Sequence, residues 1–260
     1  MPRLKLTLAY EGTRYAGWQL QAGEGKGHAP SIQGEVERAV ARIMGGRVAL
    51  FAAGRTDAGV HAEGQVCHMD LPDDARRIDW LRALNVAIPP DIRVIRAEWT
   101  DTAFHARKSA LSKRYAYSLW MHKDRALPRI QAFCWSAPEL DIPRLCAALP
   151  LLEGRHDFAS FQNSGTPVRK TVRHVFSIRF EPGFCGSLRC PDTWPVASLV
   201  FEGDGFLKQM VRNLVGVLVW VGLGKVQAES IPHILAACDR QALPSPSAPA
   251  QGLTLMDVLY

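Results

Sequence analysis

Apolar and polar side chains alternate from Arg3 to Tyr10, with leucine at every second position. This period of two predicts a strand with one buried face. The spacing then changes, because the apolar residues from Ile32 to Met44 fall on one side of a helix. Ser31 can cap this helix and Gly45-Gly46 can end it, so the pattern predicts a helix between these two signals.

The rest of the chain divides in the same way. Strands are expected at 47–53, 64–71, 91–99, 112–121, 171–180, 196–201 and 253–259. Helices are expected at 79–87, from Asp141, at 205–222 and at 230–239 with Ser230 as cap, whereas 153–170 and 182–195 are expected to be loops. This order predicts an α+β fold of two similar halves, 1–103 and 104–260, each a mixed, mostly antiparallel sheet flanked by helices, with a cleft between them.

Composition and charge narrow the class of protein. The 260 residues are 47% hydrophobic and 22% charged, which is typical of a globular protein. The longest apolar run, Leu214–Leu223, is too short to cross a bilayer. Because the chain starts with a strand pattern and not with a signal peptide, we expect a cytoplasmic protein with no membrane partner. The formal net charge of +6 favours a polyanionic partner without requiring one.

The six cysteines form no Cys-x-x-Cys pair. They are Cys67, Cys134, Cys146, Cys185, Cys190 and Cys238. Scattered cysteines of this kind indicate neither a disulfide framework nor a structural zinc site. We therefore expect reduced thiols, mostly in the core.

The stretch Ala53-Gly54-Arg55-Thr56-Asp57-Ala58-Gly59-Val60-His61 is the strongest candidate for chemistry. It places a basic, a hydroxyl and an acidic side chain between two glycines, which let the backbone turn sharply and approach a ligand. Strand-like segments lie on both sides, and loops held by a sheet often carry function. Taken alone, Asp57 could equally close a turn with its own backbone.

This stretch, followed by Gly64-Gln65-Val66, resembles the active-site motif of the tRNA pseudouridine synthase A family. Supporting motifs occur in the family's order: Tyr15-Ala16-Gly17-Trp18-Gln19, Ile32-Gln33, Phe104-His105-Ala106-Arg107, Lys113-Arg114-Tyr115, His156-Asp157-Phe158, Met210-Val211-Arg212-Asn213 and Gly252-Leu253. The resemblance covers nearly the whole chain and departs from the family in longer loops at 21–30 and 182–195.

The resemblance implies the pseudouridine synthase fold with a central, positively charged active-site cleft. It implies a cofactor-free isomerase, an intramolecular transferase that binds tRNA as a homodimer and converts uridine to pseudouridine at positions 38, 39 and/or 40 of the anticodon stem-loop. Asp57 would be the nucleophile, attacking either the ribose C1′ or the uracil C6. An ionised carboxylate suits this chemistry, but it needs a nearby cation to stay charged in a dry cleft.

Four further residues take roles from the resemblance. Arg212 would form the ion pair with Asp57, and Arg55 would fill the space of the flipped nucleotide. Tyr115 would stack on the uracil, with Leu253 on the other side of the base. Taken singly, Arg212 and Arg55 could be solvated side chains. Tyr115 and Leu253 could be ordinary core residues.

Basic residues in the predicted loops are candidates for phosphate contacts, which give affinity without reading sequence. They are Lys108, Lys113, Arg114, Arg155, Arg169, Lys170 and Lys208. Each could also be an ordinary surface charge.

Two other classes of function stay open on the residues alone. His61-Ala62-Glu63 matches the His-x-Glu of zinc nucleobase deaminases, although the Pro-Cys-x-x-Cys that must follow is absent. A basic RNA-binding protein without catalysis also fits the composition, but it gives no reason for an acid inside an arginine- and glycine-containing turn.

Overall fold

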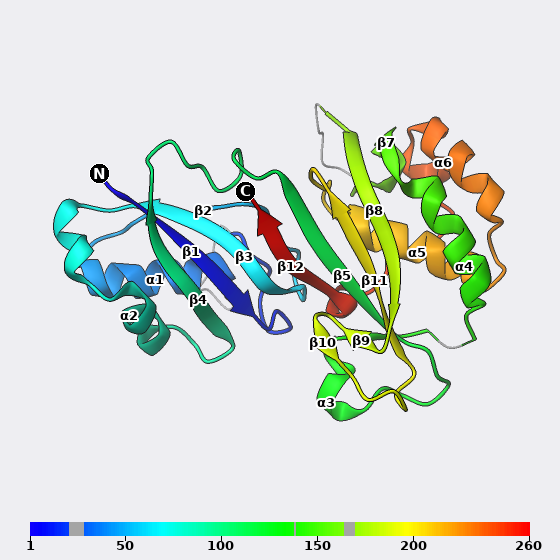
Figure 1. Ribbon diagram of the computed structural model, residues 1–260, viewed down its shortest axis with the longest axis horizontal. Helices are drawn as coiled ribbons and strands as arrows, with labels where there is room; N and C mark the ends of the chain where they lie inside the picture. The colour runs from blue at the N-terminus through cyan, green and yellow to red at the C-terminus, as the bar shows by residue number, and fades with distance from the viewer. Residues whose placement is uncertain (21–28, 138, 164–169) are drawn as a thin grey trace. The chain divides into compact units, whose positions relative to one another are not determined.

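A computed structural model describes residues 1–20, 29–137, 139–163 and 170–260. The chain forms two compact units (Figure 1). Unit 1 comprises Met1–Leu111 and Leu255–Tyr260, and unit 2 comprises Ser112–Thr254. The chain therefore leaves unit 1 once and returns to it with its last six residues. The domain division predicted at 103/104 stays a prediction.

Unit 1 contains a sheet in the order β4-β1-β3-β12, and β2 also pairs with β3. These strands are β1 (Arg3–Tyr10), β2 (Phe51–Ala52), β3 (His61–Asp70), β4 (Ile92–Thr100) and β12 (Leu253–Leu259), which belongs to unit 1 from Leu255 onward. β1 pairs antiparallel with both β3 and β4. The alternation seen in the sequence is confirmed, because every second residue of β1 is buried.

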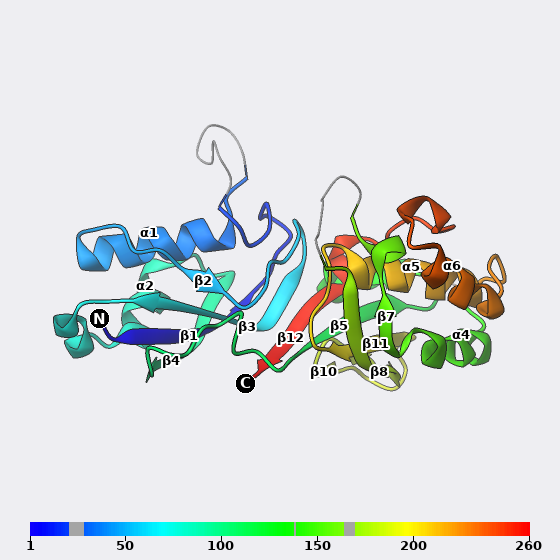
Figure 2. The ribbon, with the colours of Figure 1, turned by 90° about the horizontal axis from the view of Figure 1, so that it is seen from above.

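Two helices of unit 1, α1 (Ile32–Met44) and α2 (Trp80–Ala87), pack against each other, and α2 also contacts β4 (Figure 2). Both begin as predicted. The Ser31 side chain accepts a hydrogen bond from the Gly34 amide, and Asp79 caps α2 in the same way. Gly45 ends α1 in the left-handed conformation, with φ of 71°.

The strand predicted at 47–53 is wrong in extent, because only Phe51–Ala52 pairs with β3. The backbone of Leu50 instead bonds to α1. Its amide donates to Glu37 Oε1 at 3.1 Å, and its carbonyl accepts from Gln33 Nε2 at 3.3 Å. Helix side chains thus satisfy the groups that a neighbouring strand would otherwise pair.

Unit 2 contains a second sheet segment in the order β5-β11-β8-β7, and β6 pairs in parallel with β5. The strands are β5 (Ser112–Trp120), β6 (Trp135–Ser136), β7 (Gly154–Asp157), β8 (Val172–Pro182) and β11 (Val196–Gly203). Both neighbours of β11 run antiparallel to it, and almost all of its residues are buried. The predicted α+β class with mixed, mostly antiparallel sheets is confirmed.

The helices of unit 2 are α3 (Pro128–Gln131), α4 (Ile142–Ala148), α5 (Met210–Gly222) and α6 (Ile231–Ala237). Asp141 caps α4 as predicted. Helix α5 begins at Met210 and not at 205, because Gln209 has a φ of 61° and breaks the helical path. Ser230 is not a side-chain cap of α6, since its hydroxyl donates to the Gln227 carbonyl.

Both loops predicted in unit 2 contain pairing strands. Residues 153–170 include β7, and 182–195 include the hairpin of β9 (Phe184–Cys185) and β10 (Leu188–Arg189). Cys134, Cys185 and Cys190 are buried together in an apolar cluster with Trp120. Short 3-10 helices complete the fold at Asp73–Arg77, Leu149–Leu152, Ala159–Phe161, Ala228–Ser230, Arg240–Ala242 and Ala250–Gly252.

All six cysteines are free thiols, and the prediction that most of them are buried is confirmed for four. No helix within the described ranges has the length and apolar character needed to span a membrane.

Candidate active site

The turn that carries Asp57 connects β2 to β3. Hydrogen bonds fix its two ends, from Ala53 N to Val66 O at 2.8 Å and from Val60 N to Asp57 O at 3.2 Å. Along this turn Arg55 is exposed, Thr56 is buried and Asp57 is half-buried. The backbone of the turn is therefore fixed, while Asp57 itself is not fully buried.

A buried polar network lies under this turn. Thr56 Oγ1 is 2.8 Å from the Tyr10 hydroxyl on β1, and Gln65 Nε2 on β3 donates to the Gly54 carbonyl at 3.0 Å. Burial raises the pKa of Tyr10 to about 12, so its hydroxyl keeps its proton at neutral pH. Sequence reasoning missed Tyr10 and read it only as core.

The segment from Gly12 to Trp18 packs directly against the Asp57 turn. The Trp18 amide donates to the Thr56 carbonyl at 3.0 Å. A Cβ atom on Gly12 would lie 2.0 Å from the Val60 carbonyl oxygen, and one on Gly17 would lie 2.6 Å from that of Thr56. These glycines are required because two backbones approach within the space of a side chain. The Tyr15-Ala16-Gly17-Trp18-Gln19 motif was the only sequence signal for this contact.

His61, the first residue of β3, is buried, and its Nδ1 accepts a hydrogen bond from the Gly12 amide at 3.0 Å. This bond occupies one of the two ring nitrogens that could ligate a metal. In the part of the chain that the structure describes, no group of three His, Cys, Asp or Glu side chains is placed to hold a metal ion. The geometry therefore gives no support to the deaminase alternative.

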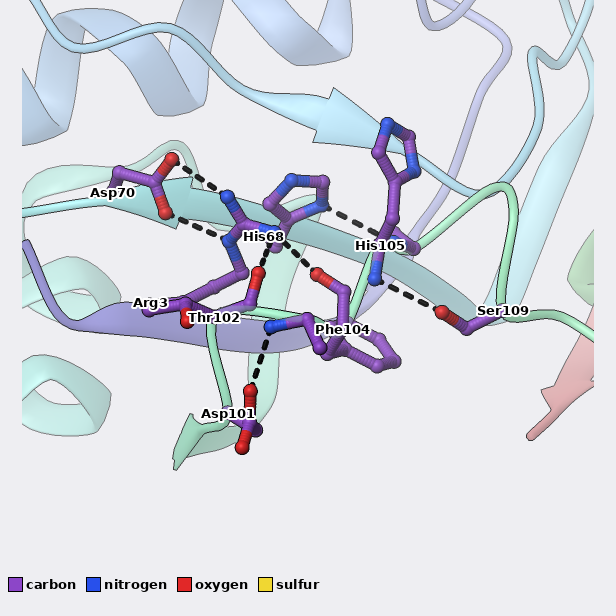
Figure 3. Close-up of polar contacts among 10 residues, drawn as sticks. Arg3, His68, Asp70, Asp101, Thr102, Phe104, His105 and Ser109 are labelled. Carbon is purple, nitrogen blue, oxygen red and sulfur yellow. Dashed lines mark hydrogen bonds and ion pairs between the residues drawn. The ribbon is translucent and has the colours of Figure 1, made fainter.

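A second turn of unit 1, residues 101–109, is held by hydrogen bonds to side chains of β1 and β3 (Figure 3). Arg3 binds both carboxylate oxygens of Asp70, at 2.7 and 2.8 Å, and donates to the Thr102 carbonyl at 2.8 Å. His105 Nδ1 accepts from the Lys108 amide at 3.4 Å. Lys108 itself is exposed, so a fixed backbone carries a side chain that can reach a phosphate.

In unit 2, Arg212 lies in the first turn of α5 and is half-buried. Its Nε donates to the Ala248 carbonyl at 2.7 Å, and the Ala248 amide donates back to the Arg212 carbonyl at 3.1 Å. The next residue, Asn213, is fully buried and donates to the Phe161 carbonyl at 2.7 Å. The guanidinium is therefore positioned by the 245–249 segment, which no sequence pattern indicated.

Tyr115 and Leu253 are both nearly buried in the structure of unit 2, with 8% and 6% of their surface exposed. The Tyr115 ring meets Phe206 edge-on, with centroids 5.3 Å apart. Two strand positions further, the Tyr117 hydroxyl donates to the Pro249 carbonyl at 2.8 Å. Tyr117 thus supports the backbone just before Leu253. Tyr115 instead contacts the ring of Phe206.

The candidate phosphate contacts differ in exposure. Lys108, Arg155, Lys170 and Lys208 are exposed, and Lys113 and Arg114 are half-buried on β5. Arg169 lies outside the described residues.

Asp57 and Arg55 belong to unit 1, while Arg212, Tyr115 and Leu253 belong to unit 2. The ion pair between Asp57 and Arg212 stays a prediction.

Comparison with known proteins identifies the class. A sequence model of the family described as tRNA pseudouridine synthase matches residues 148–260. The chain is 49% identical to tRNA pseudouridine synthase A of Oleidesulfovibrio alaskensis, across 100% of this chain and 97% of that protein. It is 46% identical to tRNA pseudouridine synthase A of Lawsonia intracellularis, across 100% of both chains.

A more distant relative agrees. The chain is 40% identical to tRNA pseudouridine synthase A of Geobacillus kaustophilus, across 99% of this chain and 94% of that protein. Fold and comparisons together define an isomerase that acts on uridine in tRNA. This chain belongs to the tRNA pseudouridine synthase A family.

Proposed function

We propose that this enzyme converts uridine to pseudouridine at positions 38, 39 and/or 40 of the tRNA anticodon stem-loop, with Asp57 as the nucleophile. The observation that carries the proposal is the Asp57 turn. Its backbone is hydrogen-bonded at both ends, and Asp57 is only half-buried between two glycines. A nucleophile needs this combination of fixed position and access.

The reaction breaks the bond between ribose C1′ and uracil N1 and forms a bond from C1′ to C5. The hydrogen leaves C5 and N1 gains one, so the product is an isomer of the substrate. Asp57 would attack either C1′ or C6, forming a covalent bond that is broken again when the base is rejoined. The residue set requires no cofactor for any of these steps.

Arg212 is the proposed partner of the Asp57 carboxylate. An adjacent cation favours the charged form of a carboxyl group, which keeps it nucleophilic in a dry cleft. The hydrogen bond to Ala248 supports this role, because it fixes Nε and so restricts the orientation of the guanidinium.

The other roles follow the family's pattern. Arg55 would occupy the position of the flipped nucleotide, and its exposure is compatible with that role. Tyr115 and Leu253 would hold the uracil from its two faces. The phosphates would be held by the basic residues Lys108, Lys113, Arg114, Arg169, Lys170 and Lys208. The homodimer and the cytoplasmic location stay predictions.

The test compares wild type with Asp57→Asn on an unmodified tRNA that carries uridines in the anticodon arm. Pseudouridine is mapped by carbodiimide treatment and primer extension, and tRNA binding is measured in parallel. Asn keeps the shape of Asp but cannot act as a nucleophile, so the variant should bind tRNA and make no pseudouridine. Glu63→Gln is the matched control, since Glu63 would be essential only in a deaminase.

Each outcome separates the candidate functions. Pseudouridine in wild type and Glu63→Gln but not in Asp57→Asn supports the proposal. Modification outside the anticodon arm overturns the positions, and an active Asp57→Asn overturns the nucleophile. RNA binding without modification in any variant favours the non-catalytic alternative.

A further inference from the structure

We propose that Tyr10 and Gln65 are positioning residues for catalysis, acting on Asp57 through a buried hydrogen-bonded chain that ends at Thr56. The inference rests on the proposed function, in which Asp57 is the nucleophile. It assigns a role to residues that contact neither the carboxylate nor the substrate in that proposal. All three residues of the chain lie in unit 1.

The chain joins three separate elements. Gln65 on β3 lies 3.4 Å from the Tyr10 hydroxyl on β1, which lies 2.8 Å from Thr56 Oγ1 in the turn. Their exposed fractions are 0%, 4% and 6%. A buried polar group without its hydrogen-bond partner destabilises the folded protein, so each of these residues constrains the position of the next.

The direction of the two hydrogen bonds made by Gln65 follows from its acceptors. The Gly54 carbonyl can only accept, so the nitrogen of the Gln65 amide must face it. The same nitrogen then donates to the Tyr10 oxygen. The Tyr10 and Thr56 hydroxyls share the next hydrogen bond, at 2.8 Å, and either of them can be its donor. A substitution at Tyr10 therefore removes a hydrogen bond of Thr56, the residue directly before Asp57.

Gln65 also carries a cost that a purely structural residue would avoid. Its Oε1 is buried and has no hydrogen-bond partner among the residues that the structure describes. A buried acceptor without a donor is destabilising, and a leucine at this position would not suffer that loss. The amide is therefore held for its two donated bonds, to the turn and to Tyr10.

The hydrogen bond to Tyr10 fixes the side chain of Thr56, and the hydrogen bond from the Trp18 amide fixes its backbone carbonyl. Loss of the side-chain bond leaves the turn in place but lets Thr56 and Asp57 shift. Small misplacements of a reacting group lower the rate by about 10- to 100-fold. We expect Tyr10→Phe and Thr56→Val to lower kcat by about that factor, with the tRNA dissociation constant unchanged.

The experiment measures single-turnover pseudouridine formation, tRNA affinity and the thermal midpoint for Tyr10→Phe, Thr56→Val, Thr56→Ser and the Tyr10→Phe/Thr56→Val double variant. Thr56→Ser keeps the hydroxyl and should restore most of the rate. Ser198→Ala is the matched control, because it also removes a buried hydroxyl, one that donates to the Phe184 carbonyl at 3.0 Å in unit 2. If a single hydrogen bond links the two sites, the double variant should be no slower than the slower single variant.

Slow Tyr10→Phe and Thr56→Val with unchanged tRNA affinity, together with an active Thr56→Ser, support the inference. A wild-type rate in Tyr10→Phe overturns it, as does an equal loss of rate in Ser198→Ala at a matched thermal midpoint. An inactive Asp57→Asn beside a fully active Tyr10→Phe overturns this inference alone. An active Asp57→Asn overturns the proposed nucleophile, and this inference with it.

Discussion

Gly252 lies so close to the Tyr117 ring that a Cβ atom there would be 2.6 Å from the ring carbon that bears the hydroxyl. Tyr117 is fully buried, and its hydroxyl donates to the Pro249 carbonyl at 2.8 Å. The turn from Pro249 to Gly252 therefore follows the ring closely. Leu253 comes directly after it, so the ring sets the point from which Leu253 departs.

Gly252→Ala should destabilise unit 2 because neither the buried ring nor the backbone can give way. Overpacking of this kind costs about 1–3 kcal/mol. Urea unfolding should show a lower midpoint, and pseudouridine formation should fall as Leu253 is displaced. Gly46→Ala is the control, since a Cβ there meets nothing within 4 Å. Equal midpoints for the two variants would contradict the prediction.

Gly17→Ala should lower activity more than its effect on stability explains. Gly17 has a φ of 95° and lies against the Thr56 carbonyl. Gly45→Ala provides the comparison, because Gly45 has a φ of 71° but open space around it. Both changes carry the left-handed backbone cost of about 1 kcal/mol. Only Gly17→Ala should also push on the Asp57 turn, which single-turnover rates at matched stability would detect.

Arg212→Lys should lose most of the activity even though it keeps the positive charge. Lysine has no Nε–H to donate to the Ala248 carbonyl, so its ammonium is not oriented. We expect kcat to fall by about 100-fold or more with tRNA binding retained. A variant that keeps its rate would show that charge alone suffices at this position.

The salt dependence of tRNA binding can test the exposed basic residues one at a time. Each phosphate contact contributes about 0.9 to the slope of log affinity against log salt on duplex nucleic acid. Alanine at Lys108, Lys170 or Lys208 should therefore reduce the slope by about 1. Arg82→Ala on α2 is the control, because Arg82 is exposed but was not assigned to the RNA surface. A slope unchanged from wild type removes that lysine from the interface.

Stability should fall in mild acid because of His68. Burial lowers the pKa of His68 to about 4, helped by the charges of Arg3 and His105. In the unfolded protein this histidine has a pKa of about 6.5. Between about pH 4 and 6.5 the unfolded state therefore binds a proton that the folded state does not. The free energy of unfolding should then decrease as pH drops from about 6.5 towards about 4, at up to about 1.4 kcal/mol per pH unit.

Urea unfolding of wild type and His68→Gln across this pH range checks the prediction. The variant lacks the titrating ring, so its stability should depend less on pH. Above about pH 6.5 the histidine is neutral in both states and contributes no pH dependence. Parallel pH profiles for the two proteins would show that another group is responsible.

Strong local patterns predicted most of the fold. The caps at Ser31 and Asp141 reappear in the structure because nearby residues alone satisfy them, and the alternation in Arg3–Tyr10 reappears because it marks the buried face of β1. The errors have distant causes. Leu50 bonds to side chains of α1, and the strand β7 exists only because β8 lies beside it. Contacts between remote segments leave little trace in a local pattern.

In the candidate site, too, local sequence patterns predicted some residues and missed those that depend on distant contacts. Asp57 could be singled out because its turn is compact in sequence and matches a family motif. The residues that support the turn could not, since Tyr10 and Gln65 look like ordinary members of strands until β1 and β3 are paired. The 245–249 segment gave no signal at all, although its backbone fixes Arg212.

The return of the last strand has a consequence for how the protein is made. Residues Leu255–Tyr260 belong to unit 1, where β12 is the neighbour of β3 and the Leu111 amide donates to the Leu259 carbonyl at 2.8 Å. A growing chain on the ribosome delivers this strand only after all of unit 2 has been synthesised. The Asp57 turn precedes β3 directly, so the sheet beside it is complete only once residues 255–260, which follow unit 2 in the chain, have been added.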